Sequence, residues 1–482
     1  MLNFKIIIKI LGFLLIVEGI SMLIAFGVAL IYMEPDVVPI LKAALISLAV
    51  GGIMVFLTKN ATKNITKNDG FVIVSLVWVV FSFFGSFPYL LSDSIPSLTD
   101  AFFETMSGFT TTGSTILNDI ESLPHGILFW RSMTQWLGGM GIIVLSLAIL
   151  PVFGIGGMQL FAAEVPGPVP DKINPKIQQT AKNLWAIYIL FTFTETILLW
   201  IGGMNLFDAV NHAFTTMATG GYSTKQASIA YWDSPFIQYV IIFFMFLAGT
   251  NFTLSYSALA GKFDRVYKNE EFKYYVFFIL GFTAIIFSGL LLSTQLGFEK
   301  AFRDALFQVV SIITTTGYST ADYLTWTPFL TILIFALFFF GGSAGSTGGG
   351  IKIMRIVLLM KNSYYELRRL LHPNAVIPVR FNKRAVSEQI ITNVLAFFMI
   401  YFIIFFFSTI LFTIIEPDLQ SAMGAVATCL GNIGPGLGHF GPIDNFYSIH
   451  PAGKWFLSFL MLLGRLELFT VLVLFSPAFW KK

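Results

Sequence analysis

The stretch TTTGYST, residues 314–320, decides the fold because related sequence returns three more times in a fixed register. In each copy, a residue pair ending in alanine is followed by a glycine thirteen positions after the first residue of the pair. The pairs begin at Asp100, Asp208, Asp304 and Ser421, and the glycines are Gly113, Gly221, Gly317 and Gly434. An internal repeat of this kind indicates that one structural unit is used four times.

The residues that precede each glycine are too rich in Gly and Thr to continue a helix. Four such loops around a common axis can present backbone carbonyls that replace the hydration shell of an ion. The sequence therefore predicts a cation-selective pore. The predicted filter residues are Thr111, Thr112, Gly113, Thr219, Gly220, Gly221, Thr315, Thr316, Gly317, Asn432, Ile433 and Gly434.

The composition is that of a membrane protein. The chain has 482 residues, of which 56% are hydrophobic and 11% charged, whereas soluble domains carry about a quarter charged residues. Its mean hydropathy of +0.78 leaves little room for a separate soluble domain. The single cysteine, Cys429, excludes an intrachain disulfide framework, and the five histidines lack metal-ligand spacing, so we expect no structural metal site.

Ten apolar runs are long enough to cross a bilayer as helices, and they predict an all-α polytopic membrane protein with ten transmembrane helices. The first run is longer than the apolar part of a signal peptide, so we expect it to be a spanning helix. The runs are Ile10 to Tyr32, Leu41 to Leu57, Phe71 to Leu91, Phe129 to Val152, Leu184 to Met204, Phe236 to Leu259, Tyr274 to Leu296, Phe329 to Leu359, Ile390 to Ile415 and Trp455 to Phe475.

The filter glycines follow the third, fifth, seventh and ninth runs. Each repeat is therefore predicted as helix, short re-entrant helix, filter loop and helix, in a pseudo-fourfold arrangement. A two-helix extension, residues 1–58, precedes the repeats. The four predicted repeats are residues 71–152, 184–260, 274–360 and 390–475.

Charge predicts the orientation. When loops are assigned alternately to the two sides, most of the 29 Lys and Arg residues fall on the side of both termini, which the positive-inside rule makes cytoplasmic. Many acidic residues fall on the other side, either as solvated loop charges or as a vestibule that raises the local cation concentration. Asp100, Asp208 and Asp304 are predicted to begin the re-entrant helices, where a carboxylate can cap free N–H groups.

The eighth run contains GGSAGSTGGG, residues 341–350, which cannot form a stable continuous helix. Non-helical backbone at membrane depth is tolerated where it lines a water-filled cavity, so we expect this segment to line the conduction path as a gate. The alternative is a close helix contact between small residues. The predicted gating residues here are Gly341, Gly342, Ser343, Gly345, Gly348, Gly349 and Gly350.

Arg465 lies near the middle of the tenth run, where an arginine is costly unless it faces a polar cavity or an acid. Counted depth places it level with residues 341–350, below the filter. We expect a constriction between the mobile glycine segment and this fixed positive charge. A structural arginine that ties helices together is the alternative.

The chain resembles the Trk/Ktr/HKT superfamily of potassium uptake proteins, and within it the TrkH type, over nearly its whole length. The resemblance rests on QWLGGMGI (135–142), GIGGMQLFAAEVPGP (154–168), TTTGST (110–115), ATGGYST (218–224), TTTGYST (314–320), GGSAGSTGGGIK (341–352), GNIGPGLG (431–438) and GRLELFTVLVLF (464–475). It implies a potassium-translocating subunit of the bacterial plasma membrane. It also implies a homodimer opened by a cytoplasmic ring of TrkA-type subunits that bind nucleotides.

The same resemblance assigns roles to residues. The filter positions match the family's ion-coordinating loops, residues 341–350 match its intramembrane gating loop, and Arg465 matches its pore arginine. Family members with serine at the first filter glycine tend to admit sodium, so Gly113 implies potassium selectivity. Ser343 departs from the cysteine of many relatives, without an expected change in function. GGGIK is no phosphate loop, because it lacks GK[ST] and a preceding strand, so no organic cofactor is expected on this chain.

Two other functions compete with a gated potassium pore. A proton- or sodium-coupled symporter would need a midplane carboxylate site and inverted repeats, whereas these repeats share one orientation. A membrane enzyme would need clustered His, Asp or Cys at the membrane boundary, which the sequence lacks. We therefore expect a non-enzymatic protein whose partners are membrane lipid, potassium and protein subunits, and no nucleic acid.

Overall fold

The computed structural model describes residues 2–61, 65–139, 141, 177–375 and 377–480. In these residues the chain is helical apart from loops and one antiparallel pair of two-residue strands, β1 (Arg380–Phe381) and β2 (Arg384–Ala385). Six helical segments of the described part are long and apolar enough to cross a membrane. They are α1 (Phe4–Tyr32), α2 (Val37–Leu57), α3 (Lys67–Gly85) with α4 (Phe87–Leu91), α9 (Ile177–Ile201), α14 (Glu270–Ser293) and α18 (Glu388–Phe412).

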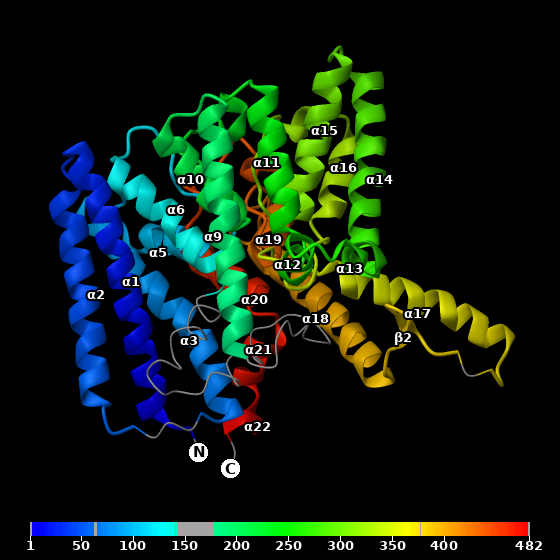
Figure 1. The fold of residues 1–482 in the computed structure, drawn as a ribbon, viewed down its shortest axis with the longest axis horizontal. Helices are drawn as coiled ribbons and strands as arrows, with labels where there is room; N and C mark the ends of the chain where they lie inside the picture. The colour runs from blue at the N-terminus through cyan, green and yellow to red at the C-terminus, as the bar shows by residue number, and fades with distance from the viewer. Residues whose placement is uncertain (1, 62–64, 140, 142–176, 376, 481–482) are drawn as a thin grey trace.

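The first two helices form a hairpin at one edge of the bundle (Figure 1). Their backbones approach closely at glycines, since a Cβ added at Gly12 would lie 2.9 Å from the carbonyl oxygen of Gly51. Small residues allow such contact between membrane helices. The predicted N-terminal two-helix extension is thus a packed unit that contacts both α3 and α6 (His125–Gly139).

Four short helices precede the repeated glycines. At 12 to 16 residues, about 1.5 Å per residue, they are too short to span a hydrocarbon core of about 30 Å. They are α5 (Leu98–Phe109), α10 (Leu206–Met217), α15 (Phe298–Ile313) and α19 (Leu419–Gly431).

The capping prediction needs correction at these helices. Ser97 and Asn205 are the N-cap residues of α5 and α10, and their side chains accept from the backbone N–H of Asp100 and Asp208 in the first turn. The prediction is wrong for Asp304, because α15 begins at Phe298, well before it. Carboxylates in the first turn still favour the positive end of the helix dipole.

Two predicted continuous spans are broken. Helix α11 (Pro235–Ala248) bends by 108° into α12 (Phe252–Leu259), and α20 (Pro451–Arg465) bends by 112° into α21 (Phe469–Leu472) with η5 (Val473–Phe475). Asn251 stabilises the helix start after the first break, since its side chain accepts from Thr253 N as the N-cap of α12. Apolar composition alone could not reveal either bend.

The eighth predicted span divides into α16 (Pro328–Leu337) and α17 (Ile353–Leu371), with non-helical backbone between them. The predicted span from Phe129 to Val152 is α6 up to Gly139, and its remainder, except Gly141, lies outside the described residues, as does the motif at 154–168. The remaining short elements are α13 (Phe263–Lys268), α22 (Pro477–Trp480), η2 (Ser228–Tyr231), η3 (Tyr323–Thr325) and η4 (Gly438–Phe440).

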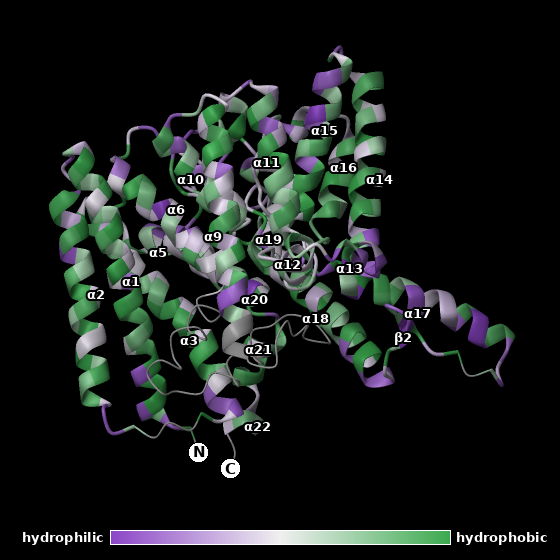
Figure 2. Cartoon of the chain, viewed as in Figure 1, coloured by the Kyte–Doolittle hydropathy of each residue, from purple (hydrophilic) through white to green (hydrophobic). Residues whose placement is uncertain are grey.

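The ends of the described chain lie at the same end of the bundle, and α17 with the β hairpin projects from its side (Figure 1). Hydrophobic residues cover the long outer helices, whereas hydrophilic ones gather at helix ends and on α17 (Figure 2). Phe56 on α2 and Leu292 on α14 are 68% and 90% exposed. Such exposure on apolar helices fits contact with lipid, so the chain is a multi-pass membrane protein.

Candidate ion-conduction site

The four filter segments share one backbone conformation. The residue two positions before each glycine has a positive φ of 52°, 53°, 59° or 54°, and each glycine has a φ of 85°, 77°, 82° or 107°. The non-glycine residues in this left-handed region are Thr111, Thr219, Thr315 and Asn432. Residues other than glycine rarely adopt this backbone conformation, so its recurrence at the same position of each repeat indicates a shared structural role.

The same segments form a closed ring. Each glycine lies against the carbonyl oxygen of the residue before the next glycine, so closely that an added Cβ would overlap or crowd that oxygen. The pairs, glycine first, are Gly113 with Gly220, Gly221 with Thr316, Gly317 with Ile433, and Gly434 with Thr112 at 2.9 Å. The fourth segment therefore meets the first, and the segments surround one axis.

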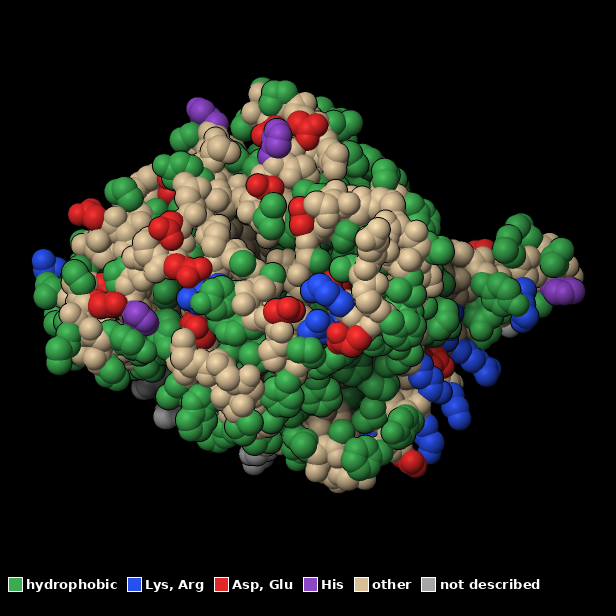
Figure 3. All heavy atoms as spheres, turned by 90° about the horizontal axis from the view of Figure 1, so that it is seen from above, with side chains coloured by type: hydrophobic (Ala, Val, Ile, Leu, Met, Phe, Trp, Pro, Cys, Tyr) green, Lys and Arg blue, Asp and Glu red, His purple; other side chains and the backbone are tan. Residues whose placement is uncertain are grey.

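All four glycines also line one cavity of ≈ 70 Å³, on the side of the ring where the segments leave the filter. Asp444, Lys225 and Arg131 contribute charged groups to its wall. Figure 3 shows the molecule from above, from the side opposite to the chain ends, with acidic side chains spread over this face.

Tyrosines tie neighbouring repeats together. The Tyr222 hydroxyl, next to the second glycine, donates to Glu104 O on α5 at 2.7 Å. The Tyr318 hydroxyl, next to the third glycine, donates to His212 O on α10 at 3.2 Å. Each tyrosine thus braces its filter segment against the short helix of the preceding repeat.

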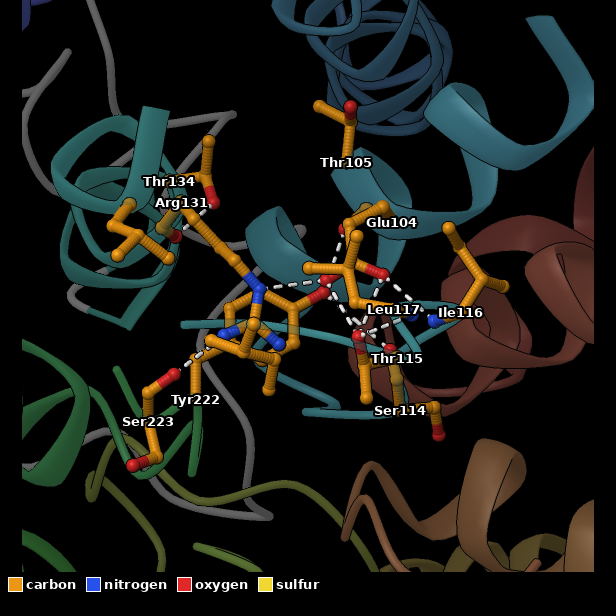
Figure 4. A network of polar contacts seen from close by, with 12 residues as sticks. Glu104, Thr105, Ser114, Thr115, Ile116, Leu117, Arg131, Thr134, Tyr222 and Ser223 are labelled. Carbon is orange, nitrogen blue, oxygen red and sulfur yellow. Dashed lines mark hydrogen bonds and ion pairs between the residues drawn. The ribbon is translucent and has the colours of Figure 1, made fainter. Parts of the chain in front are cut away.

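A buried ion pair supports the first two filter segments (Figure 4). Arg131 Nε on α6 donates to Glu104 Oε1 at 2.7 Å, and the side chains are 2% and 0% exposed. Glu104 also accepts from the Thr115 hydroxyl at 3.0 Å, while Arg131 donates to Ser223 O at 2.9 Å and stacks over the Tyr222 ring. Such a pair is tolerated in the interior because further hydrogen bonds satisfy it. Sequence analysis missed this pair, whose members are 27 residues apart.

Two acids of the short helices hold the chain as it leaves the filter. Asp208 Oδ1 accepts from the Thr224 hydroxyl at 2.6 Å, and Asp304 Oδ1 accepts from the Thr320 hydroxyl at 3.1 Å. Both threonines lie three residues after their filter glycine. In the second and third repeats, the D-A lead-in is therefore hydrogen-bonded to the chain that follows the filter glycine.

The glycine-rich segment reaches the other side of the ring. Gly349 N donates to the Thr315 hydroxyl at 2.7 Å, and a Cβ added at Gly349 would lie 2.8 Å from Asn432 Cβ. The Thr347 hydroxyl donates to Met217 O at 3.0 Å, just before the second filter segment. Residues 347–349 thus lie directly beneath three of the four segments.

The rest of the segment anchors it to surrounding helices. Gly341 N donates to Ile351 O at 2.8 Å, and Ser343 N donates to Gly249 O at the α11–α12 bend at 2.9 Å. Phe252 N donates to Gly345 O at 3.1 Å. A Cβ added at Gly342 or Gly350 would approach the Gly249 oxygen at 2.9 Å or Gly341 Cα at 3.3 Å. These contacts hold the ends of the segment while its centre, residues 347–349, meets the filter.

Arg465 connects the filter to the glycine-rich segment. It is the last residue of α20, and its guanidinium donates to the Thr111 hydroxyl at 2.9 Å and to Thr347 O at 2.7 Å. It also donates to the carbonyls of Gly138 and Gly139 at the end of α6, at 2.7 and 3.0 Å. The structure therefore brings every predicted filter residue, residues 347–349 and Arg465 to one place.

Two adjacent acids at the start of α14 hold the same region from the side. Glu271 Oε1 accepts from Ala344 N at 2.6 Å and from Met354 N at 3.3 Å, so it binds both the glycine-rich segment and the first turn of α17. Glu270 forms an ion pair with Lys361, farther along α17. Sequence analysis did not single out these residues, since acids at a helix start are common.

A multi-pass helical protein with four repeated loops around one cavity belongs to the class of membrane transport proteins. Comparison with known proteins identifies the family. Residues 38–482 match the family of cation transport proteins called TrkH, and the chain belongs to this family. Its predicted character as a transporter and not an enzyme is confirmed by this membership.

Similarity to individual family members extends over the full length. The chain is 44% identical over 488 residues to the Trk system potassium uptake protein TrkH of Escherichia coli K12, and 42% identical over 492 residues to TrkH of Vibrio parahaemolyticus, with 100% of each chain covered. The crystal structure of the potassium transporter TrkH from Vibrio parahaemolyticus matches with a TM-score of 0.90 at 39% identity, again over 100% of both chains.

Proposed function

We propose that this chain is the potassium-selective, ion-translocating subunit of a Trk-type uptake system. The closed ring of glycine and carbonyl contacts carries the proposal, because a ring of peptide oxygens can replace the water around a monovalent cation. Full-length similarity to proteins named for potassium uptake supports potassium as the ion. In this proposal the chain has ten spans, with four pseudo-fourfold repeats after the N-terminal hairpin.

Potassium-limited growth of a host without its own potassium uptake tests the proposal. The host should grow at micromolar to millimolar potassium when it produces this chain together with a cytosolic Trk partner. Substitution of sodium for potassium in the medium should not support growth. Absence of rescue, despite chain in the membrane, would contradict the proposed function.

We further propose that residues 341–350 and Arg465 form the gate. Residues 347–349 and the guanidinium lie against the inner end of the filter segments, where they would obstruct a cation. The positive charge also repels cations in a site of low dielectric constant. A symporter is the alternative, and single-channel recording separates the two because a channel passes ions far faster than a carrier turns over.

The gate would be opened from the cytoplasm, where both termini are placed in this proposal. The projecting α17 and the β hairpin carry basic residues, and α17 begins just after the glycine-rich segment. Such a lever suits a nucleotide-binding TrkA-type ring, and a homodimer of this chain would present two levers to it. Any nucleotide then belongs to the partner.

A further inference from the structure

We propose that Gln135 on α6 is a positioning residue for ion selectivity, which holds the second filter segment in place of a side chain that this segment lacks. The inference rests on the proposed function, because it concerns the same carbonyl ring. It assigns to one glutamine a role in only one of the four repeats.

The second filter segment has Ala218 and Gly220 at two positions where the first and third repeats have threonine, and the second of these positions matters here. The residue before the filter glycine is Thr112 in the first repeat and Thr316 in the third, and each hydroxyl is 2.8 Å from that of the threonine two residues earlier. The second repeat has Gly220 there. A Cβ added at Gly220 would overlap the side-chain amide of Gln135, so the glutamine occupies the space of the missing side chain.

Gln135 also makes two hydrogen bonds to this segment. Its Nε2 donates to Gly220 O at 2.7 Å, and its Oε1 accepts from Tyr222 N at 3.1 Å, so the amide spans Gly221. The partners fix the amide orientation, since a carbonyl needs a donor and an N–H needs an acceptor. The side chain is fully buried, where lost hydrogen bonds are costly.

A comparison within the molecule supports this role. Gly139 at the end of α6 and Gly249 at the end of α11 occupy equivalent places. A Cβ added at Gly139 would lie 2.6 Å from Ala218, and one added at Gly249 would lie 2.6 Å from Thr314. Ala218 and Thr314 each lie three residues before a filter glycine. Four residues before Gly249 is the buried, apolar Met245, and the filter segment that faces it has its threonine. The polar side chain thus occurs where the filter side chain is absent.

The consequence concerns the carbonyl ring. Gly220 O lies against Gly113 in the ring, and a carbonyl oxygen has two lone pairs, so it can accept from Gln135 and still contribute to the ring. Without Gln135, the segment has neither a filter side chain nor an amide to fix this peptide. If the carbonyl of one filter segment is mobile, the ring of oxygens can contract more easily around the smaller sodium ion.

The experiment measures the ratio of potassium to sodium uptake in membranes, a ratio that does not depend on how much protein is present. Gln135→Leu and Gln135→Met each remove both hydrogen bonds at similar volume without adding a charge. Each should lower the ratio about tenfold, which corresponds to about 1.4 kcal/mol for lost hydrogen bonds. Met245→Leu, at the equivalent buried position, should leave the ratio unchanged.

A wild-type ratio in either Gln135 variant that reaches the membrane overturns the inference. If Gln135→Leu is not inserted, Gln135→Met decides the question, because methionine keeps the unbranched shape of glutamine. A parallel measurement of Gly434→Ser distinguishes failure of the positioning role of Gln135 from failure of the proposed filter. A reduced ratio there with a wild-type ratio at Gln135 rejects only the positioning role, whereas wild-type ratios in both also contradict the proposed filter.

Discussion

At the scale of single residues, the filter depends on side chains held in a costly conformation. Thr111, Thr219, Thr315 and Asn432 each lie in the left-handed region, at about 1–3 kcal/mol per residue. Their surroundings offset that cost: Thr315 accepts from Gly349, and Asn432 donates to the Thr112 hydroxyl at 2.9 Å and to Met461 O at 3.0 Å. Asparagine suits the fourth position because it tolerates this region better than most residues.

Gly434→Ser should weaken discrimination against sodium. The serine would be strained at a φ of 107°, and its Cβ would lie 2.9 Å from Thr112 O, inside the carbonyl ring. Gly203→Ser is the matched control, since Gly203 has a φ of 104° with nothing within 4 Å of an added Cβ. We expect about a tenfold lower ratio of potassium to sodium uptake for Gly434→Ser only. Equal ratios in both variants would argue against the filter assignment.

Arg465→Ala should raise basal cation flux in the absence of any cytosolic partner. The substitution removes the positive charge beneath the filter and the link from Thr111 to Thr347. Liposome flux assays should show an increase of several-fold, since each 1.4 kcal/mol of barrier is about a factor of ten. Arg465→Lys keeps the positive charge but cannot make all the hydrogen bonds of the guanidinium. Its basal flux should therefore lie between that of the wild type and that of Arg465→Ala. An unaltered or lower flux in the alanine variant would reject the barrier role.

At the scale of elements, the helix that follows the filter is interrupted in the second, third and fourth repeats, near the level of the filter. Glycines allow helices to lie close to the filter segments. A Cβ added at Gly139, Gly249 or Gly464 would crowd a filter segment. In the third repeat the interruption is longer, residues 338–352, and its residues 347–349 lie against the inner side of the ring. The gate of the proposal is therefore an enlarged version of a break that the second and fourth repeats also contain.

Removal of residues 345–348 should leave a pore that leaks. The deletion removes Thr347 O, which accepts from Arg465. It also removes Gly348, which packs so close to the third filter segment that an added Cβ would lie 2.8 Å from Thr314 O. Potassium flux into liposomes should then no longer depend on a cytosolic partner. Tight closure of a deletion variant that remains folded would refute a gating loop.

Glu271→Ala should loosen the closed gate with less effect than the deletion. It releases Ala344 N and Met354 N, which join the glycine-rich segment to the first turn of α17. Loss of a charge-assisted hydrogen bond at a buried site costs about 1.5–3 kcal/mol, enough to raise basal flux about tenfold. Glu271→Gln retains an acceptor oxygen and should remain close to the wild type in the same flux assay. If alanine and glutamine variants behave alike, Glu271 does not hold the gate.

At the scale of the whole molecule, the register of the repeats predicted more than their helices did. The thirteen-residue spacing located the segments that the structure places around one cavity, because a glycine at positive φ leaves a mark in sequence. The bends after Ala248 and Arg465 were missed, since both sides of each break are equally apolar. The pair of Glu104 and Arg131 was also missed, because contacts between distant residues depend on packing that one sequence does not reveal.

The ring is closed within one polypeptide, and that has a genetic consequence. In an assembly of four identical subunits, a changed codon alters every quadrant of the opening at once. Here Thr112, Gly220, Thr316 and Ile433 fill corresponding places with three different residue types. A mutation in this chain changes one segment of the ring and leaves the other three unchanged. The proposed preference among alkali metal ions can therefore evolve through one segment at a time.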